Sequence, residues 1–155
     1  RNTILLKILG KIPLFSGLSN GSKIALISIC KKQCFQEGEV IFHDKAKSDN
    51  MYLIILGFVD IILSNNQLVA TAKAGELFGE LGVFTGEPRS ASAVARTKVE
   101  CFSIEKSELN SLLLKNSILG RDLLKNVVNM LAEKIRENNL LIEELTHRLD
   151  KSEKK

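Results

Sequence analysis

The sequence predicts an α+β protein: an antiparallel β-roll of the double-stranded jelly-roll type, with helices before it and a long dimerisation helix after it. Short stretches of period-two hydrophobicity follow one another closely in the middle of the chain, separated by Gly and Asn turns. Helical patterns occupy both ends. The 155 residues, 45% of them hydrophobic, suffice for one core. We divide them into a β-roll with N-terminal helices (1–115) and a long helix with a charged tail (116–155).

The N-terminal part is predicted to be helical. Residues 3–9 read as a short helix that ends at Gly10, and 12–18 as a turn with apolar anchors. A second helix is expected from about 20 to 31. Its inner face should carry Ile24, Ile27 and Cys30.

The middle of the chain is predicted to form strands. Residues that favour strands are separated by Glu37-Gly38, by a loop over 43–50 and by Gly57, and Asn65-Asn66 forms a plausible tight hairpin turn. The predicted strands are 34–36, 40–42, 51–56, 58–63, 67–73, 92–96 and 99–104. Many short strands with Gly-bearing turns indicate a barrel or jelly roll.

The C-terminal part is predicted to contain a short helix (107–114) and a long one (117 to about 149). Apolar residues of the long helix recur in alternating steps of three and four, and Asn138 fills the remaining place. The ladder comprises Val128, Leu131, Ile135, Asn138, Ile142, Leu145 and Leu149. It predicts a parallel homodimer through residues 124–149, in which a buried Asn138 sets the register.

A second interpretation of this helix stays open. Its first half could pack on the strands while only its end pairs with a partner. Both interpretations can hold, because the apolar face of the helix is wider before the ladder begins. The residues that widen it are Leu123, Leu124 and Val127.

Composition excludes several classes of function. The net charge of +4 is dispersed, without a dense basic stripe, so we expect no nucleic-acid contact in this chain. No apolar run approaches the roughly 20 residues of a membrane span and no signal peptide opens the chain, which predicts a cytoplasmic protein. We expect the odd set of Cys30, Cys34 and Cys101 to be free thiols, and His43 and His147 to be surface residues.

The residues best suited to binding a ligand lie in the segment 78–93. Glu80 follows Gly79, and Arg89 comes nine residues later, after an apolar turn and a Gly-Glu-Pro break. An arginine can grip a phosphate bidentately, and a carboxylate can accept hydrogen bonds from sugar hydroxyls. Glycines let backbone N–H groups approach a ligand. The segment predicts a site for an anionic, hydroxyl-bearing ligand, cyclic or linear. In the alternative interpretation, Glu80 and Arg89 simply pair with each other.

With these residues placed, the chain resembles the cyclic nucleotide-binding domain of bacterial catabolite activators, cAMP-dependent kinase regulatory subunits and cyclic-nucleotide-gated channels. The resemblance covers nearly the whole chain. Its specific part is the phosphate-binding cassette. The matching motifs are Pro13-Leu14-Phe15 with Leu18, Gln36-Glu37-Gly38-Glu39-Val40-Ile41, Met51-Tyr52-Leu53-Ile54 with Gly57, Phe78-Gly79-Glu80 and Pro88-Arg89-Ser90-Ala91.

The resemblance implies a role for each residue of the cassette. Glu80 would accept a hydrogen bond from the ribose 2′-hydroxyl, with Gly79 close to the same group. Arg89 would pair with the equatorial phosphate oxygen. Backbone N–H groups would complete the anion site. Those N–H groups belong to Leu81, Gly82, Ser90 and Ala91. The ligand would be cyclic AMP or cyclic GMP, with no cofactor and no metal.

The resemblance also implies contacts to the base. Aligned through 132–135, Asn138 and Asn139 fall where polar residues of the long helix reach the adenine, one from each protomer. An asparagine amide offers both a donor and an acceptor. Alternatively, Asn138 sets the register of the seam and Asn139 is solvated. The hydroxyl of Ser90 could help either nucleotide.

The implied function is a sensor for a cyclic nucleotide, cyclic AMP in the first place, that moves the C-terminal helix as part of a transcription regulator. No nucleophile–base pair stands out, so we expect no catalysis. The alternatives are a regulatory module of a channel, transporter or enzyme, and a ligand-free relative that acts as a dimerisation adaptor. Because the chain begins at Arg1 rather than Met, we expect a longer parent protein.

Overall fold

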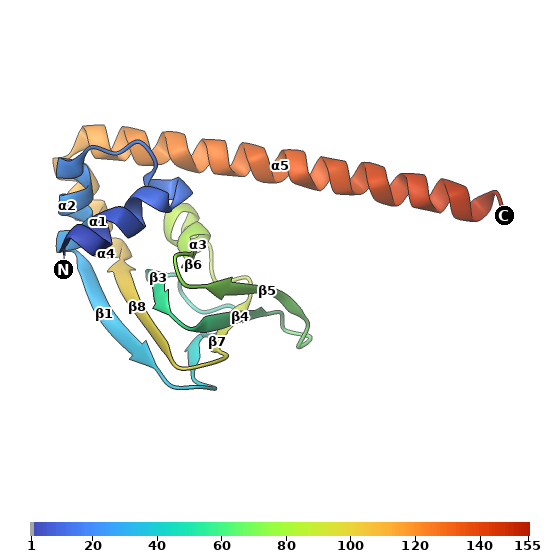
Figure 1. The fold of residues 1–155 in the computed structure, drawn as a ribbon, viewed down its shortest axis with the longest axis horizontal. Helices are drawn as coiled ribbons and strands as arrows, with labels where there is room; N and C mark the ends of the chain where they lie inside the picture. Colours follow the sequence, from blue (N-terminus) through green and yellow to red (C-terminus); the bar gives the residue numbers. More distant parts are fainter. Residues whose placement is uncertain (1) are drawn as a thin grey trace.

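The computed structural model describes residues 2–155, which form a β-roll, helices packed at one end of it, and a long helix that leaves it (Figure 1). The helices are α1 (Asn2–Lys11), the 3-10 turn η1 (Pro13–Phe15), α2 (Asn20–Ser28), α3 (Glu80–Thr85), α4 (Lys106–Lys115) and α5 (Ser117–Glu153). The strands are β1 (Cys30–Phe35), β2 (Val40–Phe42), β3 (Asn50–Leu56), β4 (Phe58–Ile62), β5 (Leu68–Lys73), β6 (Leu77–Phe78), β7 (Ser92–Ala95) and β8 (Val99–Glu105). The predicted fold class is confirmed.

The roll consists of two four-stranded antiparallel sheets, in the orders β1-β8-β3-β6 and β2-β7-β4-β5. Strand β3 is apolar on both faces because both are buried. Met51 and Leu53 join the core shared with the helices, whereas Tyr52 and Ile54 join the core between the sheets. This explains why Met51-Tyr52-Leu53-Ile54 is a continuous apolar run rather than an alternating one.

Two boundaries in the N-terminal part differ from the prediction. Helix α1 continues through Gly10 to Lys11, and α2 ends at Ser28 rather than near 31. Cys30 therefore begins β1 and does not lie on a helix. The reason is tertiary, because β1 pairs with β8 over its whole length, starting with Cys30 opposite Ile104. This ladder supplies the backbone hydrogen bonds that a longer helix would otherwise make.

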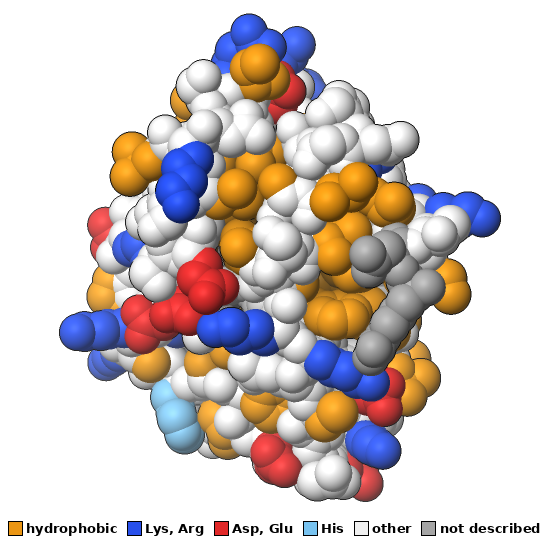
Figure 2. All heavy atoms as spheres, turned by 90° about the vertical axis from the view of Figure 1, so that its left-hand side faces the viewer, with side chains coloured by type: hydrophobic (Ala, Val, Ile, Leu, Met, Phe, Trp, Pro, Cys, Tyr) orange, Lys and Arg blue, Asp and Glu red, His pale blue; other side chains and the backbone are white. Residues whose placement is uncertain are grey.

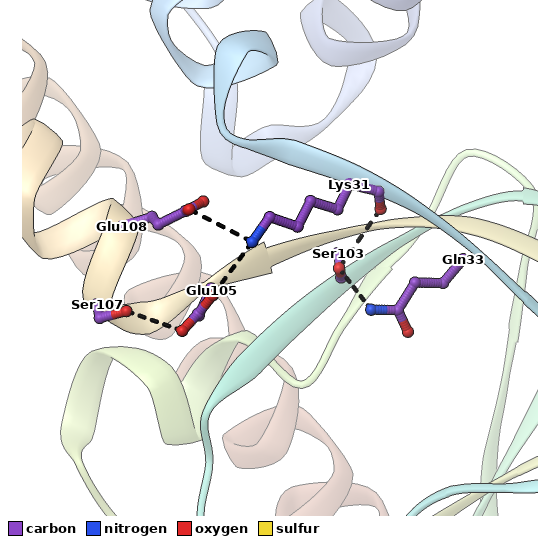
Figure 3. Close-up of polar contacts among 6 residues, drawn as sticks. All are labelled: Lys31, Gln33, Ser103, Glu105, Ser107 and Glu108. Atoms are coloured by element: carbon purple, nitrogen blue, oxygen red, sulfur yellow. Dashed lines mark hydrogen bonds and ion pairs between the residues drawn. The ribbon is translucent and has the colours of Figure 1, made fainter.

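Side chains of β1 make polar contacts with its neighbouring strand β8 and with helix α4 (Figure 3). The Lys31 ammonium lies 3.5 Å from a carboxylate oxygen of Glu105 and 3.4 Å from one of Glu108. The Gln33 amide donates a hydrogen bond of 2.9 Å to the buried Ser103 hydroxyl. The ion pairs are exposed and contribute little stability, so they mark the register rather than create it.

Helix α5 has two different halves. The Asn116 side chain caps it by accepting a hydrogen bond from the Leu119 N–H, and Leu119 and Leu123 are buried. This first half packs chiefly on η1 and α4, in the core that also holds residues of β3 and β8. The second half extends away from the roll (Figure 1). Its ladder side chains are exposed, among them Ile135 and Ile142 at 60% each.

The end of the molecule that carries α1, α2 and α4 shows apolar side chains among charged ones (Figure 2). The exposed apolar residues of these helices and the start of α5 are Ile4, Ile24, Leu114 and Ile118. Among the helices of residues 2–155, none is both long and apolar enough to cross a membrane.

Candidate functional site

A cavity of about 460 Å³ lies between α3, the loop that follows it, and the strands β4 to β6. Every cassette residue singled out from the sequence lines it. These are Gly79, Glu80, Leu81, Gly82, Arg89, Ser90 and Ala91. The fold thus brings both ends of the 78–91 segment to one hollow, because α3 and the turn after it fold the segment back on itself.

Arg89 is held by its backbone and by its side chain. Its N–H and carbonyl make hydrogen bonds of 2.8 Å with the backbone of Ala46 and Lys45. Its guanidinium Nη1 donates a 2.7 Å hydrogen bond to the Gly79 carbonyl, and Nη2 donates to the Asn50 carbonyl. With 6% of its surface exposed, the residue is buried and has little freedom.

Arg89 has no acidic partner in direct contact among the described residues. None of the ion pairs within residues 2–155 includes Arg89, and its Nε has no hydrogen-bond partner. Burial lowers its pKa, although nearby Tyr52, Asp49 and Glu80 act in the opposite direction. A buried cation without a counter-charge is costly unless an anion joins it. The geometry therefore suits a bound anion.

Glu80 lines the same cavity as the first residue of α3. Burial raises the pKa of its carboxyl, an effect reduced by its own backbone N–H, by Lys134 and by Arg89. The described residues contain no ion pair between Glu80 and Arg89, so the interpretation that the two simply pair with each other is wrong. An acceptor and a cation thus remain separately available to a ligand.

The two cassette glycines make room for the protein's own side chains. Gly79 has φ +77°, and a Cβ there would lie 2.8 Å from Arg89 Nη1. A Cβ on Gly82 would collide with Ser48, whose hydroxyl donates a 2.7 Å hydrogen bond to the Glu87 carbonyl. Without a Cβ, the backbone at these two glycines can lie close to the Arg89 guanidinium and to the hydrogen bond between Ser48 and Glu87. Leu81 and Gly82 lie in the first turn of α3, where backbone N–H groups lack helical partners.

The far wall of the cavity is mainly apolar. It is formed by Ile61 of β4 and by Ala70, Thr71 and Ala72 of β5. The Thr71 hydroxyl is already engaged, since it donates to Asp60 at 3.0 Å and accepts from Arg96 at 3.3 Å. This wall offers van der Waals contact to a flat group rather than free polar partners.

Several lining residues had no signal in the sequence. Phe42 comes from β2, Ser48 from the loop before β3, and Lys134 from α5, all distant from the cassette in the chain. Only the fold brings them together. Asn138 and Asn139 are exposed one turn beyond Lys134 on α5, and neither is among the residues that line the cavity.

The remaining candidate groups lie outside the cavity. His43 and His147 are exposed, and the three cysteines are free thiols. Burial raises the pKa of Cys101 to about 12 and that of Cys30 to about 11. Within residues 2–155, no three His, Cys, Asp or Glu side chains are grouped so as to hold a metal ion.

Comparison with known proteins places this geometry in context. The family model of the cyclic nucleotide-binding domain matches residues 32–116. The cAMP-dependent protein kinase regulatory subunit of Candida albicans is 30% identical over 146 residues, which are 89% of this chain and 32% of the relative. The chain spans about a third of the length of the curated relatives it matches.

Solved structures show the same architecture. A cyclic nucleotide-binding domain from Methylobacillus flagellatus is 28% identical with a TM-score of 0.74, covering 86% of this chain and 77% of the other. The catabolite activator protein of Thermus thermophilus is 27% identical with a TM-score of 0.72, covering 86% and 63%. The matched region contains the whole cassette with Glu80 and Arg89, and this chain belongs to the cyclic nucleotide-binding domain family.

Proposed function

We propose that this domain binds cyclic AMP in the Arg89 cavity and converts binding into a movement of α5. The observation that carries the proposal is the buried Arg89 guanidinium, which makes hydrogen bonds to neutral carbonyls and forms no ion pair with an acid in the described part of the chain. A phosphate carries the charge that this site lacks. A cavity of about 460 Å³ falls within the range of small-ligand sites.

In the proposed complex each cassette residue has one task. Arg89 pairs with the equatorial phosphate oxygen and Glu80 accepts a hydrogen bond from the ribose 2′-hydroxyl, next to Gly79. Backbone N–H groups at Leu81-Gly82 and Ser90-Ala91 add donors to the anion. The position of Glu80 and Arg89 along the same cavity supports this division, since a cyclic nucleotide presents its hydroxyl and its phosphate from adjacent atoms of one ring system.

The base is assigned to the apolar β4–β5 wall and to Asn138 and Asn139 of α5. The two asparagines lie beyond the cavity lining in a single chain, so they reach a base only if α5 closes toward the site or a partner supplies them. The free Ser90 side chain leaves cyclic GMP as the second ligand to test, since its hydroxyl can bond to either nucleotide.

Dimerisation belongs to the same proposal. The exposed ladder places Val128, Ile135, Ile142 and Leu149 at a positions and Leu131, Asn138 and Leu145 at d positions. β-branched residues at a with leucine at d favour parallel two-stranded coiled coils. We expect α5 of a second copy to cover this ladder, with Asn138 as the polar residue that sets the register.

Two outputs are supported by different relatives. The likeness to a catabolite activator favours a transcription regulator, whereas the curated relatives of about 30% identity are kinase regulatory subunits. A regulatory module of a channel or a transporter has the same binding chemistry. The parent gene separates these outputs, because a helix-turn-helix downstream indicates transcription control and a kinase-inhibitory segment indicates the other.

Calorimetric titration with cyclic AMP and cyclic GMP tests the binding. We expect Arg89→Ala to weaken affinity by about 2–5 kcal/mol, because it leaves the phosphate without its charged partner. Arg121→Ala, which removes an arginine that is 76% exposed at its side chain, is the matched control and should bind like the parent. The proposal fails if neither nucleotide binds at millimolar concentration, or if Arg89→Ala binds as tightly as the parent.

A further inference from the structure

We infer that Phe42 is a positioning residue for Arg89: its ring holds the guanidinium by a cation–π contact and leaves the positive charge free for an anion. The effect on ligand binding rests on the proposed function, whereas the contact itself lies between two side chains of the protein. Phe42 is the last residue of β2 and is far from the cassette in sequence.

The contact is close and face-on. The Arg89 Cζ lies 3.9 Å from the centroid of the Phe42 ring, well inside the roughly 6 Å range of cation–π attraction. Carbonyls of Gly79 and Asn50 accept hydrogen bonds from the two Nη atoms. The guanidinium is thus held at its rim by two carbonyls and on one face by the ring.

The Phe42 ring is itself fixed. Its centroid lies 6.2 Å from that of Tyr52 and 6.0 Å from that of Phe78, and these two rings stack at 5.1 Å. The backbone of Gly79 also packs closely against the ring, since a Cβ added to this glycine would lie only 3.3 Å from Phe42 Cε2. Phe42 also pairs with Ala93 in the sheet. The ring therefore cannot turn away from Arg89 without disturbing an aromatic cluster.

An aromatic ring suits this task better than a carboxylate would. A carboxylate in the same place would neutralise the guanidinium and compete with an incoming phosphate. The ring attracts the cation through its quadrupole and has no net charge, and the two carbonyls are neutral as well. Arg89 thus stays oriented and retains its charge for the ligand.

The experiment replaces Phe42 by mono-, di- and trifluorophenylalanine, which progressively weaken the negative face of the ring while its size changes little. The same series at Phe35, whose ring meets Tyr52 edge-on at 6.3 Å and has no cation over it among residues 2–155, is the matched control. Each variant is made with Arg89 and with Arg89→Met. Melting is measured without ligand, and affinity is measured with cyclic AMP.

We expect the melting temperature to fall step by step with fluorination at position 42 when Arg89 is present, and to fall less in Arg89→Met. The trifluoro variant should bind cyclic AMP about threefold to tenfold more weakly, because the weakened ring face holds the guanidinium less firmly in its orientation. The Phe35 series should show neither trend.

Equal melting shifts with Arg89 and with Arg89→Met would overturn the contact. Unchanged or tighter binding in the fluorinated series would overturn its positioning role. If the parent bound no cyclic nucleotide while the melting difference persisted, the proposed function would fail and the contact would stand. If Arg89→Met did not fold, the comparison of the two graded series with Arg89 in place would still decide.

Discussion

Arg89 is buried and Glu80 is half-buried, and the fold disfavours the charged form of each. Burial lowers the pKa of Arg89 and raises that of Glu80, and the two do not form an ion pair within the described chain. Ionisable groups in this condition cluster at functional sites, because a ligand supplies the partner that the free protein lacks. The site is therefore expected to cost stability until it is filled.

Removing the charge of Glu80 should therefore stabilise the folded protein. A raised folded-state pKa means that the folded state holds the proton more tightly than the unfolded chain. The stability due to this group is thus present below the ordinary value of 4.5 and is lost as pH rises through the raised pKa. Glu80→Gln does not titrate, so its melting temperature should exceed that of the parent by a margin that grows as pH rises from 4.5 to the raised pKa and is constant above it.

The same variant should bind cyclic AMP about fivefold more weakly, because a neutral acceptor replaces a charged one. Glu87→Gln removes an exposed carboxylate of the same cavity and is the control for charge alone. A melting temperature of Glu80→Gln at or below that of the parent at neutral pH would contradict the burial argument.

Gly82 and Gly120 are both helical glycines, yet substitution by alanine should act in opposite directions. At Gly82 the new Cβ meets Ser48 and lies 3.1 Å from the Glu87 carbonyl, so overpacking should destabilise by about 1–3 kcal/mol. At Gly120 the nearest atom is 3.9 Å away, and the gain in helix propensity should stabilise by about 0.5–1 kcal/mol. Urea denaturation measures both, and changes of the same sign would refute the packing account of Gly82.

At the scale of elements, α5 is attached to the rest of the molecule mainly by apolar packing. Within residues 2–155, the only side-chain hydrogen bonds from α5 to another part of the fold come from Asn126. Its amide donates to the carbonyls of Leu14 and Ser16 at 2.8 and 2.9 Å. A helix held by one polar residue and a few leucines can be redirected at modest cost.

Asn126→Ala should therefore lower the free energy of unfolding by about 1–3 kcal/mol, because two carbonyls lose their donor. Hydrogen exchange should become faster in the first half of α5. Asn129→Ala, an exposed asparagine one turn away, should change stability by less than about 0.5 kcal/mol. Equal effects of the two substitutions would show that Asn126 does not fasten the helix.

At the scale of the whole molecule, the second half of α5 presents an exposed apolar ladder that no other part of residues 2–155 covers. Exposed apolar rows of this kind mark interaction surfaces. In the proposed dimer, the second half of α5 pairs with α5 of the partner. The first half packs on η1 and α4 of its own chain. Ligand binding at one end of α5 would thus be felt at the dimer axis, provided that the ligand favours one helix position.

Ile135→Lys should prevent the proposed dimer from forming, because it places a like charge on both sides of the seam at an a position. Leu140→Lys, equally apolar in the parent and 65% exposed, lies on the opposite side of the same helix and should leave the dimer intact. Sedimentation at several concentrations distinguishes these outcomes. A monomeric parent, or a dimer that survives Ile135→Lys, would contradict the seam.

Most of the architecture followed from local patterns. The strands over 51–56, 58–63 and 99–104 were predicted because apolar residues with β-branched neighbours alternate or run between Gly turns. The long helix was predicted from its ladder. The cassette was predicted because chemically distinctive residues stand close together in the chain. These features depend on neighbours within a few residues, which a sequence displays directly.

Long-range contacts decided the rest. Lys31 and Lys32 lie in a strand because β8 is available to pair with them, 70 residues later, although their own propensity does not require it. Phe42, Ser48 and Lys134 enter the cavity only when β2, the loop before β3 and α5 pack around the cassette. Above all, the chain order shows an arginine near a glutamate, whereas folding buries Arg89 against neutral carbonyls and a ring. Burial and the absence of a counter-charge are properties of the packed protein, and they turn a recognisable motif into a site prepared for an anion.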